Sequence, residues 1–240
     1  MEEFLTAHFW FAVGQIIMID ILLGGDNAVV IALACRSLPE AQRTKGILWG
    51  TAGAIVLRVI LIAFALSLLA IPYLKLVGGV LLVWIGVKLL MPEDEDEHSN
   101  IQASDKLWGA VKTVIVADLV MSIDNVIAIA GAAQGAGEQH QLPLVIFGLL
   151  VSIPIIVWGS QLVLKLMDRF PLIITLGGML LGWIAGTMVH TDPGLVAYLP
   201  QDKAWNYGMG IAGALLVLAL GKALALRQKP ATEASEEPPQ

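Results

Sequence analysis

Long runs of apolar residues alternate with short polar segments along almost the whole chain. A helix of about 20 apolar residues crosses the roughly 30 Å hydrocarbon core of a membrane. The pattern predicts seven such helices, at residues 9–34, 46–70, 72–91, 107–131, 142–167, 170–190 and 206–226. We therefore expect an all-α, polytopic membrane protein of about seven transmembrane helices that lies in a lipid bilayer.

A repeat relates the first three predicted helices to the next three. Residues 20–32 read DILLGGDNAVVIA, and residues 118–130 read DLVMSIDNVIAIA. A nearly equal offset aligns the glycine pair 78–79 with the pair 177–178, which we expect to be notches for helix packing. Each unit has three spans, an odd number, so the second unit must enter the membrane from the opposite side. Inverted repeats of this kind are typical of secondary transporters, whose substrate site lies near the midplane.

The repeat predicts how the chain is divided. The seventh helix has no counterpart, and its glycines at 208, 210 and 213 predict close packing on a neighbour. The acidic stretches around 93–97 and near the end of the chain are predicted to be solvated and disordered. The predicted segments are 1–91 (first three-helix repeat), 92–106 (acidic cytoplasmic linker), 107–190 (second, inverted repeat), 191–227 (loop and seventh helix) and 228–240 (tail).

Lysine and arginine are distributed unequally between the two sides of this predicted bundle. One side carries only Lys75 and Lys203. The other carries Arg36, Arg43, Lys45, Lys88, Lys106, Lys112, Lys165, Arg169, Lys222, Arg227 and Lys229. Short cytoplasmic loops of membrane proteins are enriched in Lys and Arg. We therefore expect a multi-pass protein of the plasma membrane with its N-terminus outside and its C-terminus in the cytoplasm.

Four aspartates, Asp20, Asp26, Asp118 and Asp124, lie inside the predicted helices. Each costs about 2.5–3.5 kcal/mol to insert at the centre of a membrane helix. Folding a helical bundle does not require this cost, so a functional site is the default interpretation. The structural alternative is that these carboxylates cap broken helices or pair with a base. Arg58 is the one base near the middle of a predicted helix. It could neutralise one aspartate, or act in gating or in resetting an empty site.

Two Asp-Asn pairs, Asp26-Asn27 and Asp124-Asn125, each supply a charged oxygen and a neutral amide oxygen. Facing each other across a pseudo-twofold axis, they would form an oxygen-rich site suited to hard cations such as Mg²⁺, Ca²⁺ or Mn²⁺. Met121 precedes Asp124 by one helical turn. Its thioether would favour Mn²⁺ over Ca²⁺ or Mg²⁺, although methionine is more often packing material.

Helix geometry separates the two aspartates of each repeat. Residues six apart differ by about 240° around a regular helix, so Asp20 and Asp26 do not share a face. Gly24 and Gly25 lie between them and predict an unwound or kinked stretch. The second repeat has no glycine pair there. If its helix is regular, Asp118 is expected to support the site or carry protons rather than bind a metal directly.

Several classes of function are disfavoured. The net charge is −6 with no basic patch, which gives no reason to expect nucleic-acid binding. No Walker loop, HExxH motif or serine triad is present, so we expect no enzyme and no resident cofactor. The single cysteine, Cys35, excludes an internal disulfide. His190, Thr191 and Asp192 could bind a metal weakly, but a solvated loop is the favoured interpretation.

On residues 20–32 and 118–130, and over nearly all of 5–225, the chain resembles the TerC family of the LysE-type transporter group, in its YjbE-like branch. The resemblance implies a manganese exporter. It assigns metal-site roles to Asp20, Asp26, Asn27, Asp118, Asp124 and Asn125.

These observations lead to one favoured function and several rivals. We expect efflux of Mn²⁺ from the cytoplasm by alternating access, with proton exchange as the coupling hypothesis. The rivals are transport of Ca²⁺, transport of a cationic amino acid, and a membrane scaffold or assembly factor for metalloproteins. Assembly as a homo-oligomer is compatible with the sequence.

Overall fold

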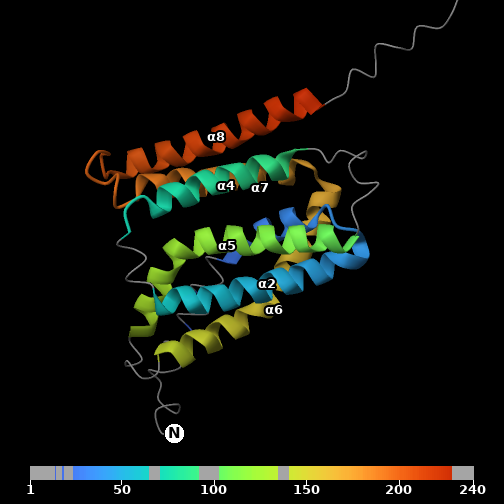
Figure 1. The fold of residues 1–240 in the computed structure, drawn as a ribbon, viewed down its shortest axis with the longest axis horizontal. Helices are drawn as coiled ribbons and strands as arrows, with labels where there is room; N and C mark the ends of the chain where they lie inside the picture. The colour runs from blue at the N-terminus through green and yellow to red at the C-terminus, as the bar shows by residue number, and fades with distance from the viewer. Residues whose placement is uncertain are drawn as a thin grey trace, which may run out of the picture.

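The computed structural model describes residues 24–64, 71–91, 103–134 and 141–228, together with the isolated positions Gly14 and Met18. Within this part of the chain all regular secondary structure is helical, as predicted (Figure 1). A helix at Gly24–Cys35 is followed by six longer ones. These are α2 (Glu40–Ala63), α4 (Leu74–Leu90), α5 (Ala103–Gln134), α6 (Gln141–Arg169), α7 (Leu172–His190) and α8 (Lys203–Gln228).

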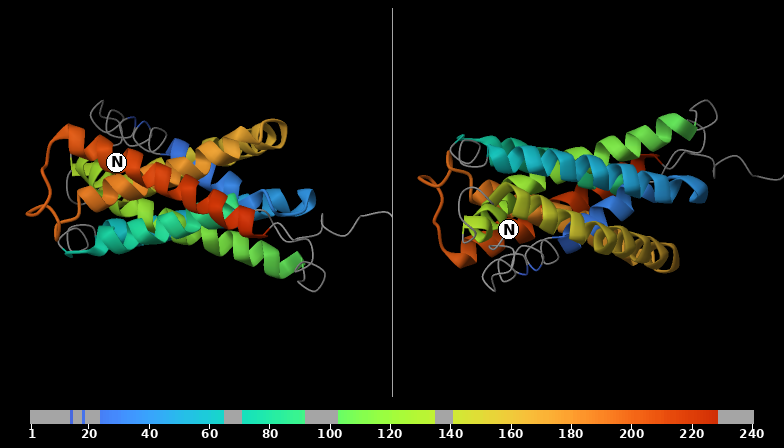
Figure 2. Two further views of the ribbon diagram at one scale, coloured as in Figure 1. Left: turned by 90° about the horizontal axis from the view of Figure 1, so that it is seen from above. Right: turned by 90° about the horizontal axis from the view of Figure 1, so that it is seen from below.

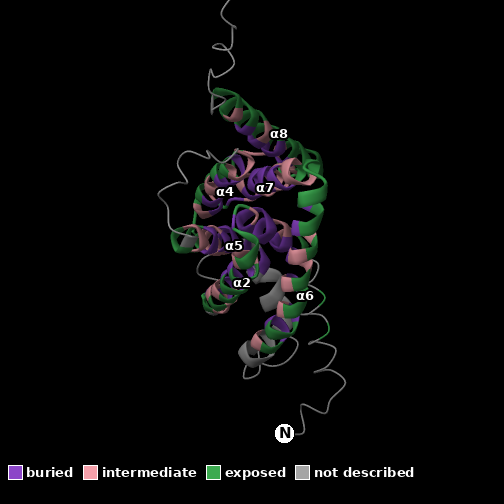
Figure 3. Ribbon diagram, turned by 90° about the vertical axis from the view of Figure 1, so that its right-hand side faces the viewer, coloured by how far each residue is buried: buried purple, intermediate pink, exposed green. Residues whose placement is uncertain are grey.

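The composition of these helices fits a membrane protein. Four of them contain stretches long and apolar enough to cross a bilayer: Glu40–Ile62, Ile146–Arg169, Leu172–His190 and Lys203–Arg227. Large apolar side chains are exposed on the outward faces, especially along α6 and α8 (Figure 3). Such faces would be unstable in water but suit contact with lipid. The prediction of a polytopic helical membrane protein is therefore confirmed.

The helix boundaries differ from the apolar runs most clearly at α2. The run at 46–70 predicted a later helix than the observed Glu40–Ala63. Pro39 precedes the first turn, where proline's fixed φ is compatible with a helix start. The first turns are polar, so hydropathy marks the part of the helix expected in lipid, and the helix itself begins earlier.

The helices run lengthwise along one axis, as both views in Figure 2 show. The colour gradient in Figure 1 shows that α2 and α5 run in one direction and α4, α6 and α8 in the other. Because α7 begins at Leu172, directly after α6 ends at Arg169, it turns back antiparallel to α6. The counterparts α2 and α6, and α4 and α7, thus run in opposite directions, as an inverted repeat requires. The segment limits given above stay a prediction.

Helices of the two units pack against each other in pairs. Helix α2 lies along α5, and α4 lies along α7. A Cβ placed on Gly50 of α2 would lie 2.9 Å from a methyl group of Val114 on α5, so the backbone of α2 comes very close there. The helix Gly24–Cys35 contacts α6, where Gly24 faces Ile156. Each pairing joins one helix of the first unit to one helix of the second.

The glycines predicted to be packing notches occupy such positions. A Cβ on Gly79 would lie 2.9 Å from the carbonyl oxygen of Ala185, and one on Gly177 would lie 2.8 Å from Leu33. On α8, Gly213 contacts the backbone of α7, which confirms its predicted role in close packing. The neighbouring Gly208 does not share this role, since a Cβ there would meet none of the described atoms within 4 Å.

Candidate functional site

A buried polar network joins the middle of α2 to the middle of α5. The Nη2 atom of Arg58 lies 2.5 Å from Oδ1 of Asp118, and its Nε donates to Oγ of Ser122 at 3.1 Å. Ser122 in turn donates to Oδ2 of Asp118, also at 3.1 Å. All three residues are at least nine-tenths buried. Arg58 thus neutralises Asp118, and both oxygens of this carboxylate are engaged.

The regular geometry of α5 brings these groups onto one face. Asp118, Ser122 and Asn125 are spaced by four and then three residues, so they lie above one another on the helix. The close approach of α2 at Gly53, where a Cβ would meet Ile115 at 2.5 Å, lets Arg58 reach this face. Asp124 belongs to the same helix, but its side chain lies outside the described part of the chain.

Asn27 supplies an unusual feature beside this network. Its side chain is buried, and neither its amide oxygen nor its amide nitrogen has a hydrogen-bond partner among the described residues. A buried polar group without a partner costs about 1–3 kcal/mol. Asn27 lines a space too narrow for a water molecule, shared with Asp118, Met121 and the aliphatic residues Val30, Ile31 and Val114. A bound cation would satisfy the oxygen of this amide.

Asn125 repeats this feature in the second unit. Its amide nitrogen is also buried without a partner among the residues that the structure describes. Asn27 and Asn125 are the equivalent residues of the two Asp-Asn pairs. Buried polar atoms in native proteins nearly always have partners, so each exception calls for an explanation. At Asn27 both amide atoms lack a partner, whereas at Asn125 only the nitrogen does, so the two equivalent positions are alike only in part.

Asp26 lies at the edge of the site and is half-buried. Its Oδ1 accepts a hydrogen bond from the backbone N–H of Asn27 at 2.8 Å, and the charges of Arg58 and Asp118 act on it. The predicted unwound stretch at Gly24–Asp26 is wrong for these three residues, which are helical. Glycine weakens a helix by only about 1 kcal/mol, and packing offsets such a cost.

The structure brings part of the predicted metal set together. Asn27, Asp118 and Met121 line one space, and the charge of Asp118 acts on Asp26. Asp20 lies outside the described residues. Within the described ranges no group of three His, Cys, Asp or Glu side chains is placed to hold a metal ion. Sequence reasoning missed the role of Ser122, although its position one helical turn after Asp118 was a usable signal.

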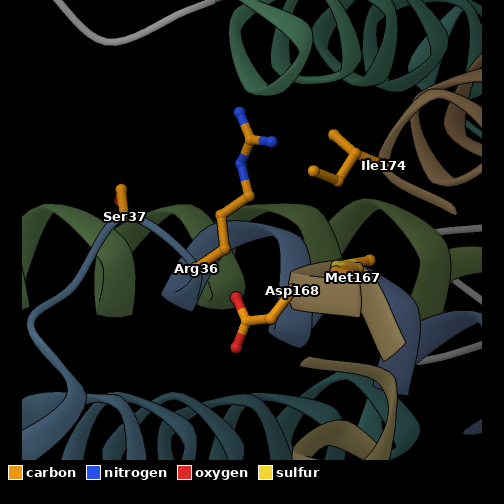
Figure 4. A pocket seen from close by; sticks show the side chains of 5 residues that line it. All are labelled: Arg36, Ser37, Met167, Asp168 and Ile174. Atoms are coloured by element: carbon orange, nitrogen blue, oxygen red, sulfur yellow. The ribbon is translucent and has the colours of Figure 1, made fainter. Parts of the chain in front are cut away.

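A second polar cluster closes the end of the bundle that carries the loops at 36–39 and 170–171. Arg43 on α2 donates to Asp168 on α6 at 2.7 Å and to the carbonyl oxygens of Leu38 and Arg36. A pocket of about 270 Å³ opens beside it, lined by Arg36, Ser37, Met167, Asp168 and Ile174. In Figure 4 the guanidinium of Arg36 extends upward, away from the carboxylate of Asp168. The Arg43–Asp168 pair therefore ties α2 to α6 at this end.

The opposite end corrects one prediction. His190, Thr191 and Asp192 do not form a solvated loop, because His190 and Asp192 are almost completely buried. Asp192 accepts hydrogen bonds from the backbone N–H groups of Tyr73, Leu76 and Gly194 at 2.7–3.0 Å. Tyr73 precedes α4 in a left-handed conformation, with φ of 65°, and α4 has no capping side chain of its own. Asp192 therefore caps a helix that is distant in the sequence.

We predict that Asp192→Ala destabilises the protein by about 1–2 kcal/mol at pH 7, as loss of a helix cap does. Burial alone would raise the pKa of the Asp192 carboxyl, but the N–H groups of Leu76, Tyr73 and Gly194 hold it below its ordinary value. The stability that the Asp192 carboxylate gives to the folded protein is complete above the ordinary pKa of about 3.9. It is lost as the pH falls through the lowered pKa of the folded state. Thermal unfolding in detergent should show a gap between wild type and variant that narrows only in strong acid. Equal melting temperatures at pH 7 would contradict this role.

Comparison with known proteins adds independent information. The sequence model described as "Integral membrane protein TerC family" matches residues 5–229. The uncharacterised membrane protein YjbE of Bacillus subtilis (strain 168) is 44% identical over 186 residues, which cover 78% of this chain and 82% of that protein. YceF of the same organism, also an uncharacterised membrane protein, is 26% identical over 73% of this chain and 69% of its own length.

More distant relatives occur outside that organism. The inner membrane protein YgdQ of Escherichia coli (strain K12) is 24% identical over 68% of this chain and 73% of its own length. No solved structure matches the chain significantly. The family match extends from before the first helix described here to the end of α8. The chain therefore belongs to the integral membrane protein TerC family.

Proposed function

We propose that this protein exports Mn²⁺ from the cytoplasm by alternating access between its two three-helix units. One observation carries the proposal: the amide of Asn27 is buried without a partner beside the buried carboxylate of Asp118. Charged and unsatisfied polar groups are costly inside membrane helices and mark ion pathways. Membership of the TerC family is consistent with ion transport.

The donor types favour a divalent cation. Carboxylate and amide oxygens suit hard ions, and the thioether of Met121 in the same space suits Mn²⁺ better than Ca²⁺. Asn27 belongs to the first unit, while Asp118 and Met121 belong to the second. A relative movement of the two units would therefore assemble or separate the ligands, which is the basis of alternating access.

The proposed orientation places the N-terminus outside and the C-terminus in the cytoplasm of a bacterial plasma membrane. The basic loops support it, since the Arg43–Asp168 cluster lies at the end rich in Lys and Arg. In this orientation the cluster ties α2 and α6 on the cytoplasmic side. No enzymatic step and no resident cofactor are part of the proposal.

Proton exchange, with two protons entering per cation exported, is the coupling that we propose. Carboxylates in a low-dielectric cavity bind protons more readily than in water, so a departing metal can be replaced by protons. Manganese transport in vesicles should then respond to an imposed pH gradient. Transport that is indifferent to the gradient would refute the coupling and leave export itself intact.

The decisive test of export uses cells that lack their own manganese exporter. Expression of the wild type should lower total cellular manganese, measured by mass spectrometry, and restore growth in manganese. Asp26→Asn and Asn27→Ala should each reduce efflux by at least about tenfold, the scale of loss seen when groups at a metal site are removed. Asp105→Asn is the matched control, because Asp105 is an exposed carboxylate in the first turn of α5.

The same strains separate the rival functions. Unchanged manganese with well-expressed wild type would contradict manganese export. Uptake of radioactive calcium or of lysine into inverted vesicles would then identify a different transporter. Full activity of Asp26→Asn would favour a scaffold or assembly role, since such a role does not need an intramembrane carboxylate.

A further inference from the structure

The one base in the middle of the bundle breaks the symmetry of the repeat. The acidic and amide residues occur in both units, but Arg58 of α2 corresponds to Ile156 of α6. Both are buried, and each faces the first helix of the other unit: Arg58 contacts Asp118, and Ile156 contacts Gly24. The guanidinium is therefore an addition to one half of an otherwise paired site.

The pairing with Arg58 already compensates the negative charge of Asp118 in this arrangement. Oδ1 of Asp118 contacts Nη2 of Arg58, and Oδ2 accepts from Ser122. The amide of Asn27 in the same space has no such contacts among the described residues. A cation that used Asp118 together with Asn27 would have to displace the guanidinium. Metal binding and the Arg58–Asp118 pair thus compete for one carboxylate.

We propose that Arg58 is a tethered cation that takes the place of the metal at Asp118 whenever the site is empty. The inference rests on the proposed export function. An arginine side chain stays charged under all physiological conditions, so it cannot neutralise itself by losing a proton. When Mn²⁺ binds, the guanidinium leaves Asp118. When Mn²⁺ departs, it returns, and the carboxylate is compensated while the empty protein reorients.

This role makes a specific prediction about two modes of transport. Exchange of Mn²⁺ for Mn²⁺ passes only through metal-loaded states, whereas net efflux requires the empty protein to reorient. In Arg58→Gln the rate of exchange should stay within about twofold of the wild-type rate. A twofold difference corresponds to a change in free energy near the limit of what can be resolved. Net efflux should fall about a hundredfold, because the empty protein must then reorient with the uncompensated carboxylate of Asp118 near the bilayer centre.

The measurement uses the full-length protein in liposomes with radioactive manganese. Exchange is measured with Mn²⁺ on both sides, and net efflux with Mn²⁺ on one side. Arg58→Lys keeps a tethered cation and should recover net efflux above the level of Arg58→Gln. Arg227→Gln removes an exposed charge at the end of α8 and should leave both modes unchanged.

A binding measurement supplies a second readout. In Arg58→Gln the metal no longer displaces a guanidinium, so the Kd of the purified variant for Mn²⁺ should be about tenfold lower than that of the wild type. This factor is expected if Asp118 of the wild type is free of Arg58 for about a tenth of the time. A purely structural role for Arg58 would leave the Kd unchanged or weaken it. An unchanged or weaker Kd in the folded variant would overturn the proposal.

The outcomes distinguish this inference from the proposed function. Wild-type protein that neither binds nor exchanges Mn²⁺ would refute export itself. Net efflux by Arg58→Gln at the wild-type rate would refute only the role of Arg58. If Arg58→Gln does not fold, the double variant Arg58→Gln/Asp118→Asn, in which both positions are neutral, replaces it in both transport assays. Because no carboxylate at position 118 then needs compensation, the ratio of net efflux to exchange should match that of the wild type, and a ratio about a hundredfold lower would overturn the proposal.

Discussion

Gly186→Val should separate α8 from α7 and lower the free energy of unfolding by about 3 kcal/mol, the upper range for overpacking in a dense interior. A Cβ on Gly186 would overlap the carbonyl oxygen of Met209, and one on Gly213 would overlap that of Gly182. These are backbone atoms, which cannot rotate away as a flexible side chain can. The two helices must move apart, and the dispersion contacts along their interface are lost.

The same helix provides a matched control for this substitution. At Gly208 of α8 an added Cβ meets none of the described atoms within 4 Å, so Gly208→Val should change stability by less than about 1 kcal/mol. Both variants can be compared with the wild type by thermal unfolding in detergent, with size-exclusion chromatography to detect aggregation. Equal melting temperatures for Gly186→Val and the wild type would show that the close approach of α7 and α8 is not required.

Much of the fold could be predicted because the membrane restricts it so strongly. Backbone groups in lipid must satisfy their hydrogen bonds internally, so each long apolar run had to be a helix. The repeat fixed the opposite directions of α4 and α7, since three spans per unit is an odd number. The ends of α2 were less predictable, because its polar first turns extend beyond the apolar run that marks lipid contact.

The candidate site was predictable in kind but not in its contacts. Helical periodicity places Asp118 and Ser122 on one face of α5, which follows from spacing alone. The partner of Arg58 did not follow from spacing, because it depends on the register of α2 against α5. That register is set where the side chains of Val114 and Ile115 pack against Gly50 and Gly53 of α2, which is a tertiary feature.

The misjudged residues near the other end show a different limit. A short polar segment next to a proline is typical of a solvated turn, and His190 to Asp192 fitted that pattern. In the structure Asp192 instead satisfies backbone N–H groups at the start of α4, more than a hundred residues earlier. A sequence shows which groups need hydrogen bonds, but it does not show which distant segment supplies them.

Asp118→Asn should destabilise the protein by about 3 kcal/mol, because removing one member of a buried ion pair leaves the other charge poorly compensated. The pair is almost completely buried, and the asparagine has only one acceptor oxygen for two donors, Arg58 and Ser122. Arg58→Met should have a similar cost. The double variant Arg58→Met/Asp118→Leu should recover most of the loss, since apolar residues of similar volume often replace buried pairs without penalty.

A double-mutant cycle measured by unfolding in detergent tests this expectation. The exposed pair of Arg43 and Asp168, whose carboxylate side chain is 51% accessible, is the internal control and should show a coupling below about 1 kcal/mol. Purely additive effects at Arg58 and Asp118 would show that the two do not act as a unit. A double variant that is stable but does not export Mn²⁺ would mean that the buried charges are retained for transport, since an apolar pair would hold α2 against α5 equally well.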